Sequence, residues 1–269
     1  MMIFVKLLAL PNLGHENDSA RSKTTARDVA MQRLLHQNSF AMSTMLKFYY
    51  HPLSPISRRV WLGLLEKQIS YQPIEVNLGT GQQFEPEFLT INPFHHVPVI
   101  VDDDFRVIES LVVLDYLELR CPDLALMPTE IQAITKMRMV QQVAVNELMP
   151  NLIAVINAQQ QPLSDTQQTR LATAWQFLDN ELQGKTYFGG DRLNLGDIVA
   201  GATIPLFHRL GVSLNNYPCL EAWRQGISER PAWQQTQPDE FSFQRWQKWV
   251  QLQIRRKTKS EEKLTQLGY

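Results

Sequence analysis

The 269-residue sequence predicts an α/β domain over residues 45–121, followed by an all-helical domain over residues 129–256. Between residues 46 and 120, short apolar runs typical of strands alternate with apolar residues at helical spacing. Beyond residue 130 the apolar residues recur at helical spacing alone. The hydrophobic content of 44% is sufficient for a chain of this length to bury the cores of two modest domains.

The α/β domain is organised around its first unit, residues 46–61. An apolar and aromatic run of strand character ends at Pro52, and helical spacing begins after Pro55, a residue that suits the first turn of a helix. Ser54 precedes this proline, where its hydroxyl can cap free backbone N–H groups at a local anion site. Most serines in this position serve only as helix caps, so the unit by itself does not establish a ligand site.

The remaining elements of the domain follow in a clear order. Alternating apolar residues predict a second strand over residues 69–77, and a short helical segment over 84–89 ends at an Asn-Pro pair. A buried strand over 97–101, a turn of three aspartates and a returning strand over 105–108 form a hairpin, and a helix then runs to residue 120. The order β-α-β-α-β-β-α predicts a thioredoxin-like domain, in which a right-handed crossover makes the first two strands parallel.

The two ends of the chain differ from the predicted domains. Residues 1–44 are mostly polar after a short apolar start that lacks the features of a secretory signal. We interpret them as a disordered N-terminal arm, and Met42 and Met45 leave open that they lie upstream of the true start. Residues 257–269 are interpreted as a charged, solvated tail.

The composition excludes several classes of partner. The formal net charge is −1 with acidic and basic residues interspersed, which disfavours a nucleic acid or an anionic membrane as partner. Cys121 and Cys219 lie far apart in the sequence and outside metal-ligand spacing, so we expect neither a metal site nor a disulfide framework. The low cysteine content is consistent with a protein of the reducing cytoplasm. No run of about 18 apolar residues is present, which excludes an ordinary membrane-spanning helix.

The helical domain is predicted to be a bundle. One long helix carries an apolar stripe from residue 131 to 155, and a second spans residues 163–182. Asn194 with Asp197 three residues later makes a capping box, so Asp197 is interpreted as structural rather than catalytic. The tryptophans near the end of the chain, including Trp246 and Trp249, lie at a spacing typical of packing.

Five short motifs follow one another along the chain. They are Ser54-Pro55-Ile56-Ser57-Arg58-Arg59-Val60, Asn92-Pro93-Phe94-His95-His96-Val97-Pro98-Val99-Ile100, Glu109-Ser110, Asn194-Leu195-Gly196-Asp197-Ile198 and Tyr217-Pro218. Together they resemble the motifs of cytosolic glutathione transferases of the serine type, a group that includes theta-, phi- and zeta-like bacterial enzymes. The resemblance covers residues 46–235 and lies in the sequence of spacings more than in any single motif. It implies a thioredoxin-like, glutathione-binding domain, a helical bundle, and an enzyme that uses glutathione as co-substrate.

Glutathione chemistry requires a stabilised thiolate, and the first motif offers a hydrogen-bond donor for it. A thiol with a pKa of ~8.5 is mostly protonated at neutral pH, and lowering this pKa by ~2 units needs ~2.7 kcal/mol. A charge-assisted bond from the Ser54 hydroxyl, worth ~1.5–3 kcal/mol, together with a helix N-terminus, worth ~0.3–1 kcal/mol, reaches this magnitude. Ser57, three residues later, is the alternative donor. A shift of three residues in the match to the family motif would give Ser57 the role assigned to Ser54, but the spacing to Val60 favours Ser54.

The resemblance implies further contacts around the co-substrate. The backbone of Val97, held by a cis Pro98, would pair with the cysteinyl part of glutathione. Glu109 and Ser110, at the start of a helix, would bind the γ-glutamyl end through side chains and backbone N–H groups. His96 stands where relatives contact the glycyl end, while the preceding histidine replaces their glycine, so we expect backbone strain there.

We therefore predict conjugation of the glutathione thiolate to an apolar electrophile by a cytoplasmic homodimer that serves detoxification and the stress response. The helical face of residues 141–148 is expected to shape the acceptor pocket. The dimer would bury residues 105–116 and 131–145, which carry more apolar side chains than one buried helix face needs. Two alternatives remain open: a non-catalytic binding or assembly module on the same fold, and a glutathione-dependent isomerase or dehalogenase.

Overall fold

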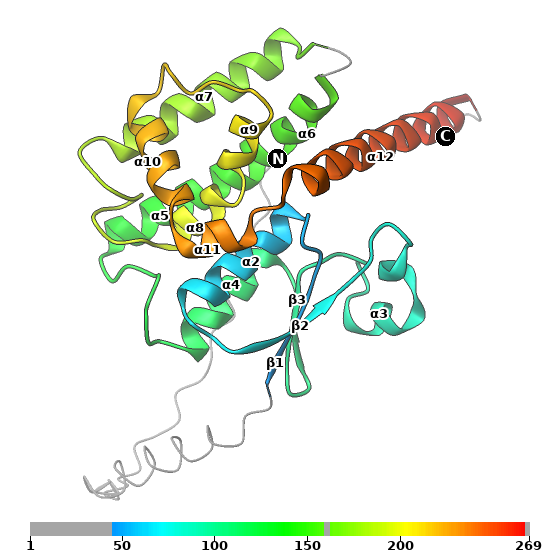
Figure 1. Ribbon diagram of the computed structural model, residues 1–269, viewed down its shortest axis with the longest axis horizontal. Helices are drawn as coiled ribbons and strands as arrows, with labels where there is room; N and C mark the ends of the chain where they lie inside the picture. Colours follow the sequence, from blue (N-terminus) through cyan, green and yellow to red (C-terminus); the bar gives the residue numbers. More distant parts are fainter. Residues whose placement is uncertain (1–44, 159–161, 267–269) are drawn as a thin grey trace, which may run out of the picture. The chain divides into compact units, whose positions relative to one another are not determined.

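A four-stranded mixed sheet in the order β2-β1-β3-β4 forms the first part of the chain. The computed structural model describes residues 45–158 and 162–266, whose helices and strands appear in Figure 1. Strand β1 (Leu46–Tyr50) pairs parallel with β2 (Tyr71–Glu75) and antiparallel with β3 (Val99–Asp102), which pairs antiparallel with β4 (Phe105–Val107). The predicted thioredoxin-like arrangement is therefore confirmed. The arm predicted for residues 1–44 lies outside the described residues.

Helices cover both faces of this sheet. Helices α2 (Pro55–Glu66) and α4 (Ser110–Arg120) supply four residues to a core that also contains four strand residues: Leu46, Phe48, Val60, Leu64, Ile100, Val107, Val113 and Leu117. On the other face, Phe88 of α3 (Pro86–Ile91) packs in a smaller cluster after the 3₁₀ turn η2 (Gln82–Phe84). Gly63 lets α2 approach α4, because a Cβ there would lie 2.6 Å from Cδ2 of Leu114.

The rest of the described chain is helical, as predicted. Its segments are α5 (Ile131–Val143), the π turn η3 (Ala144–Leu148), α6 (Met149–Ala158), α7 (Asp165–Leu182), α8 (Leu195–Gly201), α9 (Ile204–Arg209), α10 (Pro218–Ser228), α11 (Pro231–Thr236) and α12 (Glu240–Gln266). Their apolar faces form one large core cluster that also takes in Leu62 of α2 and Leu114 of α4. The sheet part and the helical part therefore share a core and are joined by the segment between α4 and α5.

The capping box at the start of α8 is fully buried. The Oδ2 atom of Asp197 accepts the N–H of Asn194 at 2.9 Å. Its Oδ1 atom accepts the N–H of Phe188 at 3.0 Å and the indole N–H of Trp223 at 2.8 Å. Because all these contacts hold backbone and core groups together, the structural interpretation of Asp197 is confirmed.

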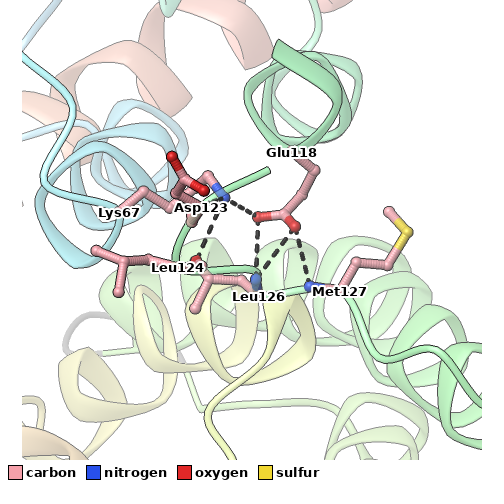
Figure 2. A network of polar contacts seen from close by, with 6 residues as sticks. All are labelled: Lys67, Glu118, Asp123, Leu124, Leu126 and Met127. Carbon is pink, nitrogen blue, oxygen red and sulfur yellow. Dashed lines mark hydrogen bonds and ion pairs between the residues drawn. The ribbon is translucent and has the colours of Figure 1, made fainter. Parts of the chain in front are cut away.

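A buried ion pair holds the segment between α4 and α5 (Figure 2). The Nζ atom of Lys67, directly after α2, lies 2.8 Å from Oε1 of Glu118 in α4, and these side chains are 1% and 5% exposed. The Glu118 carboxylate also accepts the N–H groups of Leu126 and Met127 at 3.1 Å, and Lys67 donates to the carbonyl of Leu124 at 3.3 Å. The network ties the joining segment to two helices of the sheet part, which fixes where the helical part begins.

Helix α12 extends into the segment that we expected to be a charged tail, residues 257–269. It continues to Gln266 because neither proline nor glycine occurs between Pro238 and Gly268, so no residue in this stretch breaks the helix.

The stretch Ile131–Ala158 is long and apolar enough to cross a membrane when judged by length and composition alone. Met137, Val140 and Leu152 of this stretch are buried in the core of the bundle. Packing inside the protein therefore accounts for its apolar composition.

Candidate active site

A cavity of about 1090 Å³ lies between the sheet part and the helices α6, α11 and α12. The sheet part lines it with the β1–α2 loop, the segment after β2, the loop before β3 and the start of α4. All six residues that the sequence singled out for the site belong to this lining: Ser54, His96, Val97, Pro98, Glu109 and Ser110. The fold thus gathers side chains from three separate loops around one cavity.

Ser54 is the N-cap of α2. Its Oγ atom accepts the N–H of Ser57 at 3.2 Å, and its own backbone N–H donates to the carbonyl of His51 at 3.0 Å. A hydroxyl that accepts a capping bond keeps its proton for donation, so Ser54 can cap α2 and still donate to an anion in the cavity.

Ser57, the alternative donor, has a different environment. It lies inside α2, is 1% exposed, and its Oγ atom accepts the backbone N–H of His51 at 3.3 Å. The described lining of the cavity includes Ser54 but not Ser57. The tertiary structure therefore favours Ser54 of the two.

The start of α4 forms a second polar part of the lining. The first helical hydrogen bond of α4 runs from the N–H of Val113 to the carbonyl of Glu109 at 2.8 Å. The backbone N–H groups of residues 110–112 therefore take no part in the helical hydrogen bonds. No side chain caps this end of the helix. Glu109 itself has a φ of +66°, a strained conformation that is common at ligand-binding positions. Together these features suit a carboxylate ligand at this end of the helix.

The loop before β3 carries the next predicted contacts. The Val97–Pro98 peptide bond is cis, as expected, and Val97 precedes the paired residues of β3. Asn92 fixes the loop, since its amide donates to the carbonyl of His96 at 2.8 Å and its Oδ1 accepts the N–H of Phe94 at 3.0 Å. The backbone strain expected at His95 is confirmed by its φ of +49°.

His51 lines the cavity, although sequence analysis assigned it no role. Its Nδ1 atom accepts the N–H of Leu53 at 3.2 Å, which places the proton of the neutral ring on Nε2. Burial lowers the pKa of His51 in spite of the opposing charge of Glu75, so the ring is neutral at neutral pH. Its position directly after β1 could have predicted this role, because ligand sites in α/β folds form at the carboxyl ends of strands.

The expectation that residues 141–148 shape the cavity is wrong. Gln141 is fully buried and its amide donates to the carbonyl of Leu195 at 3.4 Å, toward α8. The helical lining comes instead from α6, with Met149, Leu152 and Ile153. The π turn η3 explains the shift, because the wider turn changes the helical phase of every residue that follows it.

Helix α12 supplies the largest missed part of the lining. Trp246 and Trp249, interpreted from the sequence as packing residues, both line the cavity, together with Ser242, Arg245, Val250, Gln253 and Ile254. Trp246 also belongs to the bundle core, so this one residue both packs in the core and lines the cavity.

Within residues 45–158 and 162–266, no three His, Cys, Asp or Glu side chains are grouped to hold a metal ion.

Two family models match the chain. The model described as glutathione S-transferase, N-terminal domain, matches residues 53–120, and the model described as glutathione S-transferase, C-terminal domain, matches residues 126–231. Among curated proteins, a zeta-class glutathione S-transferase of Euphorbia esula is 29% identical over 203 residues, which span 72% of this chain and 90% of that protein. Maleylacetoacetate isomerase of Rattus norvegicus is 28% identical over 196 residues, which span 71% of this chain and 91% of that protein.

Solved structures of similar fold include a glutathione transferase and a glutathione transferase homologue. A delta-class enzyme of Nilaparvata lugens aligns with a TM-score of 0.67 at 23% identity, covering 77% of this chain and 99% of that chain. A glutathione transferase homologue of Drosophila mojavensis with bound glutathione aligns with a TM-score of 0.67 at 21% identity, covering 78% of this chain and 97% of that chain. At these identities the likeness concerns the fold.

Proposed function

Because the chain belongs to the glutathione S-transferase family, we propose that it transfers the glutathione thiolate to an apolar electrophile and that Ser54 stabilises this thiolate. The chain is an enzyme of this family, with glutathione as its co-substrate. One observation carries the proposal: Ser54 lines the same cavity as the uncapped start of α4 and the Val97–Pro98 bond.

The polar lining accommodates glutathione as an extended peptide. The γ-glutamyl carboxylate binds the free N–H groups and the hydroxyl at Ser110, and Glu109 meets the ammonium group. The main chain of Val97 pairs with the cysteinyl part in the manner of an added strand, and His96 meets the glycyl end. This placement brings the sulfur to Ser54, at the N-terminus of α2.

The acceptor site lies along α6 and α12. Its apolar side chains are Met149, Leu152, Ile153, Trp246, Trp249 and Val250. Arg245 is the only lysine or arginine among the described lining residues, and its guanidinium carbon lies 5.6 Å from the ring centre of Phe241. An apolar electrophile that carries a carboxylate would place this group toward Arg245.

Turnover of 1-chloro-2,4-dinitrobenzene with glutathione tests the role of Ser54. We expect Ser54→Ala to lower kcat by ~10-fold or more, because it removes one charge-assisted hydrogen bond worth at least ~1.4 kcal/mol. Ser57→Ala is the matched control and should have less effect, because that hydroxyl is bonded inside the protein. An inactive Ser57→Ala variant beside an unchanged Ser54→Ala variant would show that the two roles are exchanged.

Glutathione-dependent isomerisation is the second candidate, favoured by the relatives named maleylacetoacetate isomerase. Addition of the thiolate to a cis double bond permits rotation, and its elimination returns the trans product and free glutathione. Incubation with a cis-unsaturated oxo-carboxylate separates the two reactions. Isomerisation leaves the glutathione concentration unchanged, whereas conjugation consumes one glutathione for each product molecule.

We also propose that the enzyme is a homodimer. Among the described residues, the two surfaces expected from the sequence expose Phe105 (61%), Val112 (54%), Ile131 (78%) and Met139 (39%). Large apolar side chains of this exposure, gathered on β4, α4 and α5, suit association with a second copy. Cytoplasmic localisation and a role in detoxification and the stress response remain predictions.

A further inference from the structure

We infer that Arg58 is a positioning residue whose buried charge, directly behind the Ser54 loop, stabilises the glutathione thiolate. The inference rests on the proposed role of Ser54 and adds a second source of stabilisation. It concerns a residue that does not line the main cavity and does not itself touch the co-substrate.

The backbone places Arg58 one helical turn after Ser54. The N–H of Arg58 donates to the carbonyl of Ser54 at 2.9 Å, which closes the first turn of α2 and sets the two residues one turn apart along the chain. Both residues line a second, small cavity of about 10 Å³, together with Pro52, Leu53, Pro55, Leu206, Pro238, Phe243 and Trp246. Arg58 and Ser54 therefore border the same small cavity.

The Arg58 side chain is only 3% exposed, and its bonded partners are neutral. Its Nε donates to Oγ1 of Thr236 at 3.0 Å, and its Nη2 donates to the carbonyl of Trp233 at 3.2 Å. Its buried Nη1 has no hydrogen-bond partner among the described residues. The nearby Arg209, by contrast, pairs with Glu240 at 2.8 Å. A buried cation with neutral partners leaves its field available to an anion formed close by.

Arg58 remains charged under working conditions. Burial, with a smaller contribution from Arg209, lowers its pKa to about 10, so it stays protonated at neutral pH. The lining of the small cavity is largely apolar, which limits screening of the charge by water. As a general scale, at an effective dielectric constant of ~20 a positive charge about 12 Å from a thiol lowers the pKa of that thiol by about one unit.

The test is the thiol pKa of enzyme-bound glutathione, measured from the ultraviolet absorbance of the thiolate, together with the pH profile of kcat/KM. We expect Arg58→Gln to raise this pKa by about one unit, a tenfold loss of thiolate below the pKa. Arg58→Lys, which keeps the charge, should stay close to the wild-type value. Thr236→Val, which removes a neutral partner and keeps the charge, should also stay close to it.

Arg59→Gln is the matched control, because Arg59 is the next residue, is equally buried at 3% exposure and does not line the small cavity. A pKa rise of the same size in Arg59→Gln, or an equal rise in Arg58→Lys and Arg58→Gln, would overturn the inference. If Arg58→Gln does not fold, Arg58→Met, which is also uncharged and of similar length, takes its place: a thiol pKa raised by about one unit supports the inference, and an unchanged value overturns it. If wild-type protein does not lower the thiol pKa, or Ser54→Ala leaves it unchanged, the proposed function fails instead.

Discussion

Replacing Glu118 with glutamine would remove the negative partner of a buried ammonium group while keeping the size of the side chain. The Nζ of Lys67 and Oε1 of Glu118 are 2.8 Å apart, with side chains 1% and 5% exposed (Figure 2). In Glu118→Gln the ammonium has only neutral acceptors among its described neighbours, including the carbonyls of Asp123 at 3.4 Å and Leu124 at 3.3 Å. Both carboxylate oxygens of Glu118 accept backbone N–H groups of Leu126 and Met127, whereas the amide of glutamine has only one oxygen to accept them. The substitution therefore also weakens the hydrogen bonds to the segment between α4 and α5.

Removing one partner of a buried ion pair lowers the free energy of unfolding by ~3–5 kcal/mol. Because two carbonyls remain near Lys67, we expect the lower end of this range. A change of ~3 kcal/mol corresponds to a fall in Tm of ~6–12 °C for a protein of about this size. Urea denaturation and scanning calorimetry measure the two quantities. The control is Glu147→Gln, which breaks an ion pair whose side chains are 54% and 34% exposed and should change stability by less than ~1 kcal/mol.

The double variant Lys67→Met, Glu118→Gln distinguishes charge from hydrogen bonding. It leaves no buried charge without a partner, so we expect it to recover part of the stability that Glu118→Gln loses. Neither residue lines the cavity, so glutathione affinity of the folded variants should stay unchanged. A loss below ~1 kcal/mol in Glu118→Gln would refute the reasoning. A double variant no more stable than Glu118→Gln would assign the effect to the backbone bonds rather than to the ion pair.

Three further predictions concern packing, assembly and specificity. Gly201→Ala should lower the free energy of unfolding by ~1–3 kcal/mol in urea denaturation, because the new Cβ would lie 2.8 Å from the Trp233 indole in α11. Gly226→Ala is the control: its Cβ would meet open space, so it should raise the free energy of unfolding by ~0.5–1 kcal/mol. Light scattering should give twice the mass of 31.1 kDa, and Phe105→Glu should shift it toward one chain; a concentration-independent monomer would exclude the dimer. Arg245→Gln should lower kcat/KM for 4-chloro-3-nitrobenzoate by ~10-fold and spare 1-chloro-2,4-dinitrobenzene; an equal loss with Lys248→Gln would contradict this.

Local sequence chemistry was sufficient for the order of elements in the sheet part and for six of the residues that line its side of the cavity, although it missed His51. The prolines after β1 and before β3, and the Glu109-Ser110 pair before α4, each act within a few residues of their own position. The helix start at Pro55 accordingly appears where the sequence predicted it, and the cis bond at Pro98 appears where the family resemblance implied it. Ser54 could be named for the same reason, because an N-cap is defined by the residues that immediately follow it.

The other side of the cavity was decided by tertiary structure. The π turn at Ala144–Leu148 changes the phase of α6, and nothing in the local apolar pattern signals it. Trp246 and Trp249 lie at a spacing that fits packing and lining equally well, and only the position of α12 over the cavity distinguishes the two. Arg58 likewise reads as an ordinary helix residue, since its partners Trp233 and Thr236 lie 175 and 178 positions away. Which groups meet across such separations depends on the packing of whole helices, whereas caps, turns and helix starts depend on neighbouring residues alone.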